Sequence, residues 1–136
     1  MIATVHRQAN FNSAHRMHNK NWSDEKNKAY YGACNNPNYH GHNYKLIVKI
    51  TGEIDPESGY VIDMKKVGDL INEEVIERFD HMNLNIDCSE FDNMTTSSEN
   101  IAMVIHQKLR AKIDPKFKLS IVLYETEKNF VEFSDQ

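Results

Sequence analysis

The stretch from Cys34 to Tyr44 brings together residue types that bind metal ions. His40 and His42 stand two residues apart, Cys34 lies six residues before His40, and strand-like alternation begins after His42. In an extended strand, residues two apart point to the same face, so both imidazoles would face one ligand. Two neutral imidazoles on one face form half of a tetrahedral zinc shell. The competing interpretation is a pair of polar residues at the mouth of a strand.

A second segment with histidines follows a strand predicted near the start of the chain. Apolar and polar residues alternate over residues 2–12, although Arg7 interrupts the apolar face. This strand would deliver His15 and His18 to its end. Either histidine could supply a third metal ligand, and their spacing alone leaves both possibilities open.

Two acidic positions stand out because they follow elements that are apolar on one face. Asp80 and His81 come directly after a helix predicted over residues 64–78. The pair is typical either of a favourable histidine at the carboxyl end of a helix or of an acid–base histidine tuned by a carboxylate. Glu125 continues the apolar face of a strand predicted over residues 117–124, and such local conflicts mark functional sites.

The remaining pattern predicts the elements that position these residues. A capping box over Thr96–Glu99 would start a helix that ends near residue 111, and Gly68 weakens the earlier helix or lets another group pack close to it. Residues 19–33 lack a period and are expected to form a long connection. Further strands are predicted at residues 43–52, 60–62 and 130–133. Strands joined as hairpins, with both helices between them, predict an α+β fold: an antiparallel sheet with helices on one face.

The composition limits the classes of protein that need to be considered. The 136 residues are expected to form one domain over 1–136, and 40% hydrophobic with 26% charged residues is ordinary for a globular chain. The net charge of -4 argues against nucleic acid as a partner. No apolar run reaches membrane-spanning length, and residues 1–16 lack the apolar core of a signal peptide. We therefore expect a cytoplasmic protein without a membrane partner.

Five stretches taken together resemble the 6-pyruvoyltetrahydropterin synthase family, which includes the 6-carboxytetrahydropterin synthases of queuosine biosynthesis. They are Phe11–Arg16, Cys34–Tyr44, Asp80–Leu84, Ser97–Ala102 and Tyr124–Glu127, and they cover the chain in order. The resemblance implies the tunnelling fold (T-fold), a four-stranded antiparallel sheet with two helices on one face. It also implies that three subunits close a barrel, that two trimers form a homohexamer, and that the substrate is 7,8-dihydroneopterin triphosphate.

The resemblance further implies roles for the residues at the candidate site. Zinc would be the cofactor, and the third ligand would be His15, so that His18 has no assigned role. Cys34 would be the general base, and Asp80 with His81 would form a proton relay contributed by a neighbouring subunit. The residues implied in pterin binding are Glu125, which would anchor the ring, and Ser97, Ser98 and Glu99, for which the helix-cap interpretation stands alongside.

The resemblance leaves more than one activity open. The first is a zinc-dependent carbon–oxygen lyase of tetrahydrobiopterin biosynthesis, which eliminates triphosphate and forms 6-pyruvoyltetrahydropterin. The second is a 6-carboxytetrahydropterin synthase of queuosine biosynthesis, which acts on the same substrate and also releases acetaldehyde. The spacing from Cys34 to His40 is the longer one found in the pyruvoyl enzymes, and it favours the first activity. A pterin-binding zinc protein without catalysis is disfavoured by the joint presence of Cys34, Asp80 and His81.

Overall fold

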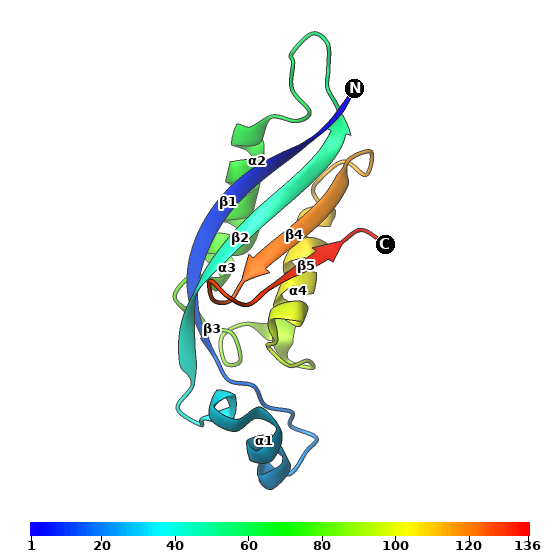
Figure 1. Cartoon of the computed structure of the whole chain (residues 1–136). Helices are drawn as coiled ribbons and strands as arrows, with labels where there is room; N and C mark the ends of the chain where they lie inside the picture. Colours follow the sequence, from blue (N-terminus) through cyan, green and yellow to red (C-terminus); the bar gives the residue numbers. More distant parts are fainter.

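One sheet, antiparallel apart from one short strand, organises the molecule together with helices on one face (Figure 1). The computed structural model describes all residues from Met1 to Gln136. In chain order the elements are β1 (Ile2–His15), α1 (Asp24–Tyr31), the 3-10 turn η1 (Gly32–Asn35), β2 (His40–Glu53), α2 (Met64–Ile71), the π-helical turn η2 (Asn72–Ile76), α3 (Glu77–Phe79), β3 (Met82–Asn83), the 3-10 turn η3 (Ser89–Phe91), α4 (Ser98–Arg110), β4 (Lys118–Tyr124) and β5 (Phe130–Ser134). None of these helices combines the length and the apolar character that a membrane crossing requires.

The strand order is β3-β1-β2-β4-β5, and the four long strands are antiparallel to their neighbours. The predicted α+β class and four-stranded antiparallel sheet are therefore confirmed. The sequence pattern did not predict β3, which pairs parallel to β1 through only two residues, Met82 and Asn83. Two residues are too few to establish an alternating pattern, so no sequence period could reveal this strand.

The core lies between the sheet and the layer formed by α2, η2, α3 and α4, which Figure 1 shows on one side of the strands. Alternate residues of the central strands are fully buried: Leu46, Val48 and Ile50 in β2, and Leu119, Ile121 and Leu123 in β4. Burying each such side chain stabilises the fold by about 1.5–3 kcal/mol. This packing fixes the register of β1, β2 and β4, whose ends carry the candidate site residues.

Two predicted segments differ from the structure. Residues 24–31 form α1, where the sequence predicted an aperiodic connection. Ser23 caps this helix by accepting a hydrogen bond from Lys26 N, but most of its side chains are exposed, so no apolar period announces it. Residues 60–62 do not form a strand, because Tyr60 closes a turn in which its carbonyl accepts from Asp55 N and the following residues pack against the core.

The predicted helix over residues 64–78 is present as α2, η2 and α3, with Asp63 as its N-cap. The start of α4 differs by one residue from the predicted capping box. Ser97 is the N-cap and accepts from Asn100 N at 3.2 Å, whereas a box over Thr96–Glu99 would need Thr96 as the cap. Thr96 is instead buried beside the end of β1, where its main chain has another role described below.

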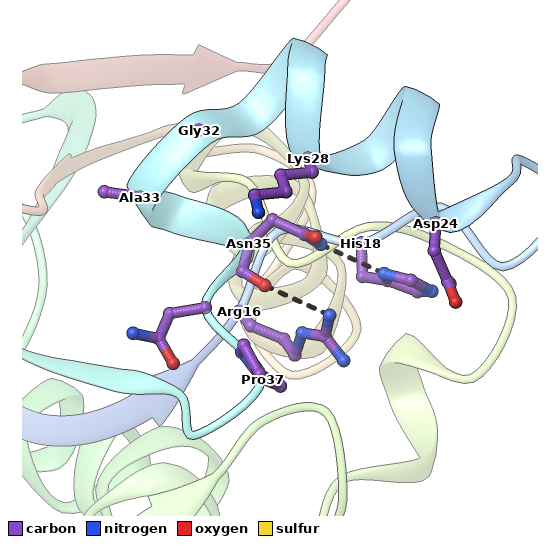
Figure 2. Close-up of a pocket in the computed structure, with 9 residues that line it drawn as sticks. Arg16, His18, Asp24, Lys28, Gly32, Ala33, Asn35 and Pro37 are labelled. Atoms are coloured by element: carbon purple, nitrogen blue, oxygen red, sulfur yellow. Dashed lines mark hydrogen bonds between the residues drawn. The ribbon is translucent and has the colours of Figure 1, made fainter.

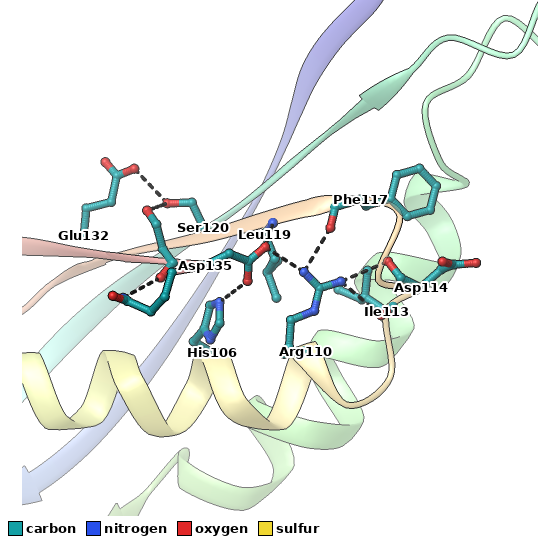
Figure 3. Close-up of polar contacts among 11 residues, drawn as sticks. His106, Arg110, Ile113, Asp114, Phe117, Leu119, Ser120, Glu132 and Asp135 are labelled. Atoms are coloured by element: carbon teal, nitrogen blue, oxygen red, sulfur yellow. Dashed lines mark hydrogen bonds and ion pairs between the residues drawn. The ribbon is translucent and has the colours of Figure 1, made fainter.

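A cluster of hydrogen bonds fastens the end of the chain to α4 (Figure 3). The carboxylate of Asp135 accepts from His106 Nε2 at 2.8 Å, from Arg110 Nη1 at 2.8 Å and from the main-chain N–H of Leu119 at 2.7 Å. Arg110 also donates to the main-chain oxygen of Phe117 at 2.9 Å. These bonds join α4, β4 and the segment after β5, and so hold in place the strand that leads to Glu125.

Candidate active site

His15, His40 and His42 lie together at the adjoining ends of β1 and β2. The pairing of β1 with β2 sets His15 opposite His40, and Ser13 opposite His42. One ligand nitrogen from each histidine lies within 4.8 Å of the other two. His40 and His42 lie two residues apart on one face of β2, and His15 lies opposite His40 on the same face of β1. The register of the two strands therefore brings the three imidazoles together. A metal ion could therefore be bound by three side chains from a rigid part of the sheet.

The protonation of His15 suits a metal ligand. Its Nδ1 atom lies 2.8 Å from the main-chain oxygen of Thr96. Because a carbonyl oxygen only accepts, Nδ1 carries the hydrogen and Nε2 keeps its lone pair. Burial lowers the pKa of His15 to about 4, despite the hydrogen bond to Thr96, and burial also lowers the pKa of His42. Both imidazoles are therefore neutral at pH 7, as metal ligation requires.

The Nε2 atoms of His15 and His42 are buried and have no hydrogen-bond partner. Buried polar atoms without a partner are rare in folded proteins, and a metal ion held by both nitrogens would satisfy them. Three imidazoles that leave one side open are the donor set of a catalytic zinc site. The residues therefore fit a zinc ion.

His18, which the spacing left open as a third ligand, lies outside this cluster. Its Nδ1 atom lies 3.0 Å from Nδ2 of Asn35 instead. His18 also lines a different cavity from the residue before it, Met17. Of the two histidines, the structure brings His15 to the pair on β2.

Glu125 follows β4 and faces the histidine cluster. Its Oε1 atom is 3.8 Å from Nε2 of His42, its Oε2 atom is 3.9 Å from Nε2 of His15, and Ser98 Oγ donates to Oε2 at 2.9 Å. Glu125 interrupts the apolar period of its strand because it borders the histidine cluster. Ser98 connects this carboxylate to the first turn of α4.

A cavity of about 430 Å³ lies beside Glu125, in the size range of small-molecule sites. The four residues proposed to bind substrate all line it. Its full lining is Met17, Ser97, Ser98, Glu99, Glu125, Lys128, Asn129, Phe130 and Val131. Ser97 also caps α4, so capping the helix and lining the cavity are compatible for this residue.

Tyr44 lies beside the histidine cluster, and the sequence pattern did not mark it as a site residue. Its ring stacks on Phe11 with centroids 4.9 Å apart and meets the ring of His42 edge-on at 5.6 Å. The side chain is fully buried and its hydroxyl has no hydrogen-bond partner. Burial, with a smaller effect of Glu125, raises its pKa. The sequence feature that could have identified Tyr44 is its position in the strand. It continues the two-residue period of His40 and His42 and so lies on the same face of β2.

Cys34 is exposed and lies in η1. The group of side chains close enough to share a metal ion holds only the three histidines, so the thiol lies outside it. The main-chain oxygen of Cys34 accepts from Met17 N at 2.8 Å, which fastens η1 beside the segment that follows β1. This position leaves the thiol free for chemistry other than metal binding.

Asp80 and His81 form a bonded pair between α3 and β3. Nδ1 of His81 lies 2.9 Å from Oδ2 of Asp80, whose Oδ1 accepts from Asn12 N at 2.8 Å. The hydrogen bond from Asn12 lowers the pKa of Asp80 and keeps it ionised. The side chain of His81 is 82% exposed, and none of its polar contacts reaches the three histidines or Cys34 of the same chain. The pair is therefore open to solvent or to another molecule and makes no polar contact with the histidine cluster of its own chain.

Comparisons with known proteins agree with this arrangement. A family model described as 6-pyruvoyl tetrahydropterin synthase matches residues 4–136. The 6-pyruvoyl tetrahydrobiopterin synthase of Homo sapiens is 36% identical over 134 residues, covering 98% of this chain and 92% of the human protein. A putative 6-pyruvoyl tetrahydrobiopterin synthase of Caenorhabditis elegans is 38% identical over 133 residues, covering 97% of this chain and 94% of that protein.

The solved structure of Caenorhabditis elegans 6-pyruvoyl tetrahydropterin synthase is similar throughout, with a TM-score of 0.94 and 36% identity, covering 100% of this chain and 97% of that one. The Plasmodium vivax enzyme of the same name, at 19% identity and a TM-score of 0.74 over 100% and 99% of the two chains, shares the fold. The expected tunnelling fold is thus confirmed, and the chain belongs to the 6-pyruvoyl tetrahydropterin synthase family.

Proposed function

We propose that this chain is a cytoplasmic, zinc-dependent lyase that converts 7,8-dihydroneopterin triphosphate into 6-pyruvoyltetrahydropterin and triphosphate. The observation that carries the proposal is the cluster of His15, His40 and His42, with buried unpartnered nitrogens, directly beside the carboxylate of Glu125. Membership of the family and the names of its full-length relatives support this reaction.

The three histidines would hold the zinc ion through one nitrogen each. When bound, zinc supplies Lewis-acid chemistry: it would polarise the oxygens of the substrate side chain and acidify the adjacent C–H and O–H protons. Neutral imidazoles favour this role, and the hydrogen bond from His15 to Thr96 orients one of them.

Glu125 is proposed to anchor the pterin ring. A carboxylate can accept two parallel hydrogen bonds from the guanidine-like edge of the ring, and these charge-assisted bonds are about twice as strong as neutral ones. Ser98 holds one carboxylate oxygen at 2.9 Å, which limits the orientations that Glu125 can take. The lining of the adjacent cavity by Ser97 and Glu99 supports placing the ring there.

Cys34 is proposed to act as the general base, with Asp80 and His81 as a relay that moves the proton onward. Asp80 holds His81 through Nδ1, so that the other ring nitrogen remains available. Because this pair faces outward, it would serve the site of a neighbouring subunit. A closed oligomer, a homohexamer of two trimers, is therefore proposed. It would also cover the free edge of β5 and the part of β1 that β3 does not pair.

A 6-carboxytetrahydropterin synthase is the second candidate. A putative enzyme of that name from Archaeoglobus fulgidus is 37% identical over 73 residues, covering 54% of this chain and 57% of that protein. The relatives that match nearly the whole chain carry the pyruvoyl name, and this difference in coverage favours the first candidate.

Turnover of 7,8-dihydroneopterin triphosphate, with products identified by mass, tests the proposal. We expect 6-pyruvoyltetrahydropterin and triphosphate. A 6-carboxyl product with acetaldehyde would establish the second candidate instead. Binding of the pterin without any turnover by zinc-loaded protein would contradict both and leave a binding protein.

A further inference from the structure

A second cavity, of about 780 Å³, lies between η1, α1 and the segment that follows β1 (Figure 2). The proposed reaction assigns it no role. Its lining is Arg16, His18, Asp24, Lys28, Gly32, Ala33, Asn35, Asn36 and Pro37. The lining residues alternate with Met17 and Cys34, which do not line it. The cavity therefore lies behind the backbone segments that carry Met17 and Cys34, close to the candidate active site but separate from it.

The charge of the cavity favours an anion. Arg16 and Lys28 are permanent cations, and the only carboxylate in the lining is Asp24. Figure 2 shows the ends of the Arg16 and Lys28 side chains on either side of Asn35. An excess of positive charge gathers here although the whole chain has a net charge of -4. Such local reversal of the overall sign concentrates anionic ligands.

Arg16 lines this cavity and is held in place beside it. Its Nη2 atom donates to the main-chain oxygen of Asn35 at 3.1 Å, but its buried Nε–H has no partner. Asn85 holds the main chain of Arg16 from both sides, accepting from its N–H at 2.9 Å and donating to its oxygen at 3.1 Å. This fixed backbone holds the guanidinium in the lining of the cavity, where it can donate to the oxygens of a bound anion.

The polar neighbours suit an extended anion with several oxygens. Lys28 forms no ion pair with a residue of this chain within 4.0 Å, so its ammonium is available. The side chain of Asn36 and the imidazole of His18 add further hydrogen-bonding groups to the lining. Arginine provides a planar fork for phosphate and lysine a compact point charge, and together they are typical of phosphate recognition.

We propose that this cavity binds a linear triphosphate chain through Arg16 and Lys28. The proposal deepens the proposed function and rests on it for the choice of triphosphate among polyphosphate anions. The same chemistry has two sources: the triphosphate arm of the substrate and the free triphosphate released by the reaction. Both would present oxygens to the guanidinium of Arg16 and the ammonium of Lys28.

The test is calorimetric titration of zinc-loaded protein with inorganic triphosphate, without any pterin. Lys28→Gln should weaken binding about tenfold, the effect of losing one charge-assisted hydrogen bond. Lys26→Gln is the matched control, because Lys26 is on the same helix but packs over the ring of Trp22 at 4.2 Å. It changes the net charge equally and should leave affinity unchanged. Any chelation of zinc by triphosphate is common to both variants.

Kinetics then separate the two sources. If the site takes the substrate arm, Lys28→Gln raises KM for the triphosphate substrate, leaves kcat unchanged, and leaves unchanged the affinity for a dihydropterin without phosphates. If it takes free product, Lys28→Gln leaves KM unchanged and weakens inhibition by triphosphate. The proposal would be overturned if the protein did not bind triphosphate, or if Lys28→Gln and Lys26→Gln lowered the affinity for triphosphate equally. Because titration needs no turnover, failure of the proposed reaction would be seen separately.

Discussion

The hydrogen bond between Nδ1 of His15 and the main-chain oxygen of Thr96, 2.8 Å long, joins the histidine cluster on the sheet to the start of α4. Thr96 is itself held, since its hydroxyl donates to the main-chain oxygen of Arg16 at 3.2 Å. The end of β1 and the N-terminus of α4 thus position one another. When one ring nitrogen of a histidine forms such a hydrogen bond, the bond orients the imidazole and determines which nitrogen remains free to bind a metal.

The first prediction concerns metal content. His15→Ala, His40→Ala and His42→Ala should each lose bound zinc and activity, because each removes one of three protein ligands. Wild-type protein should bind one zinc ion per chain, measured by atomic absorption after dialysis. His18→Ala is the control and should retain the metal, since His18 hydrogen-bonds to Asn35 instead. Stoichiometric zinc in all three variants would reject the assignment.

The second prediction separates Cys34 from the ligands. Cys34→Ala should keep its zinc and its pterin affinity but lose turnover by about two to four orders of magnitude, the usual contribution of a general base. Glu125→Ala should show weak pterin binding with zinc retained. Alkylation should reach the exposed Cys34 faster than Cys88, which is buried and whose pKa is raised by burial. Loss of zinc in Cys34→Ala would identify the thiolate as a ligand instead.

The third prediction concerns the outward pair Asp80 and His81. If His81 serves a neighbouring subunit, Cys34→Ala and His81→Ala proteins that are dissociated and reassembled together should partly recover activity. Mixed sites would then hold an intact Cys34 from one chain and an intact His81 from another. Sedimentation should show an oligomer for both parents. Verified mixed oligomers that stay inactive, or an active monomer, would count against a shared site.

Several of these relationships could be predicted from the sequence because they follow from local periods. The two-residue spacing of His40 and His42 placed them on one face of a strand, as observed. Two irregularities noted in the sequence also turn out to be one contact: the guanidinium of Arg7 packs over Gly68, where an added Cβ would lie 2.7 Å from Arg7 Nη2. Arg7, which interrupts the apolar face of β1, thus packs on Gly68 of the facing helix α2.

Other features depend on tertiary pairing that no local pattern encodes. The choice of His15 over His18 came from family resemblance, and it is the register of β1 with β2 that brings His15 opposite His40. The helix α1 is held by its cap and by aromatic packing of Trp22 on Tyr31 rather than by an apolar face on the core. Tyr44 reads as an ordinary core residue in the sequence, and only its unpartnered hydroxyl distinguishes it.

The fourth prediction follows from that hydroxyl. Tyr44→Phe should raise the free energy of unfolding by up to about 1 kcal/mol, because it removes a buried polar group that forms no hydrogen bond. Urea unfolding of metal-free protein measures the change. Tyr60→Phe is the control, since Tyr60 is 63% exposed and its hydroxyl can be hydrated in both states. A loss of stability in Tyr44→Phe would show that the hydroxyl has a partner, such as a buried water.

The last prediction concerns pH and the ion pairs of Glu90. Arg78 donates to Glu90 through Nε at 2.8 Å and Nη2 at 2.6 Å, and Lys108 Nζ lies 2.9 Å from the same carboxylate. Burial by itself raises the pKa of Glu90, but the hydrogen bonds from Arg78 and Lys108 outweigh it and lower the pKa from 4.5 to about 2. The folded state therefore binds a proton less readily than the unfolded state.

A depressed pKa stabilises the fold above the unfolded value, and this stabilisation is lost as the pH falls from about 4.5 to about 2. Glu90 should contribute roughly 2–4 kcal/mol at neutral pH. Glu90→Gln should thus be clearly less stable than metal-free wild type at pH 7, and the difference should shrink at pH 4 and further at pH 3 in urea unfolding. Glu57→Gln, on an exposed turn where the carboxylate forms no ion pair, is the matched control for the loss of one charge. A pH-independent deficit in Glu90→Gln would show that Glu90 acts through packing and not through its charge.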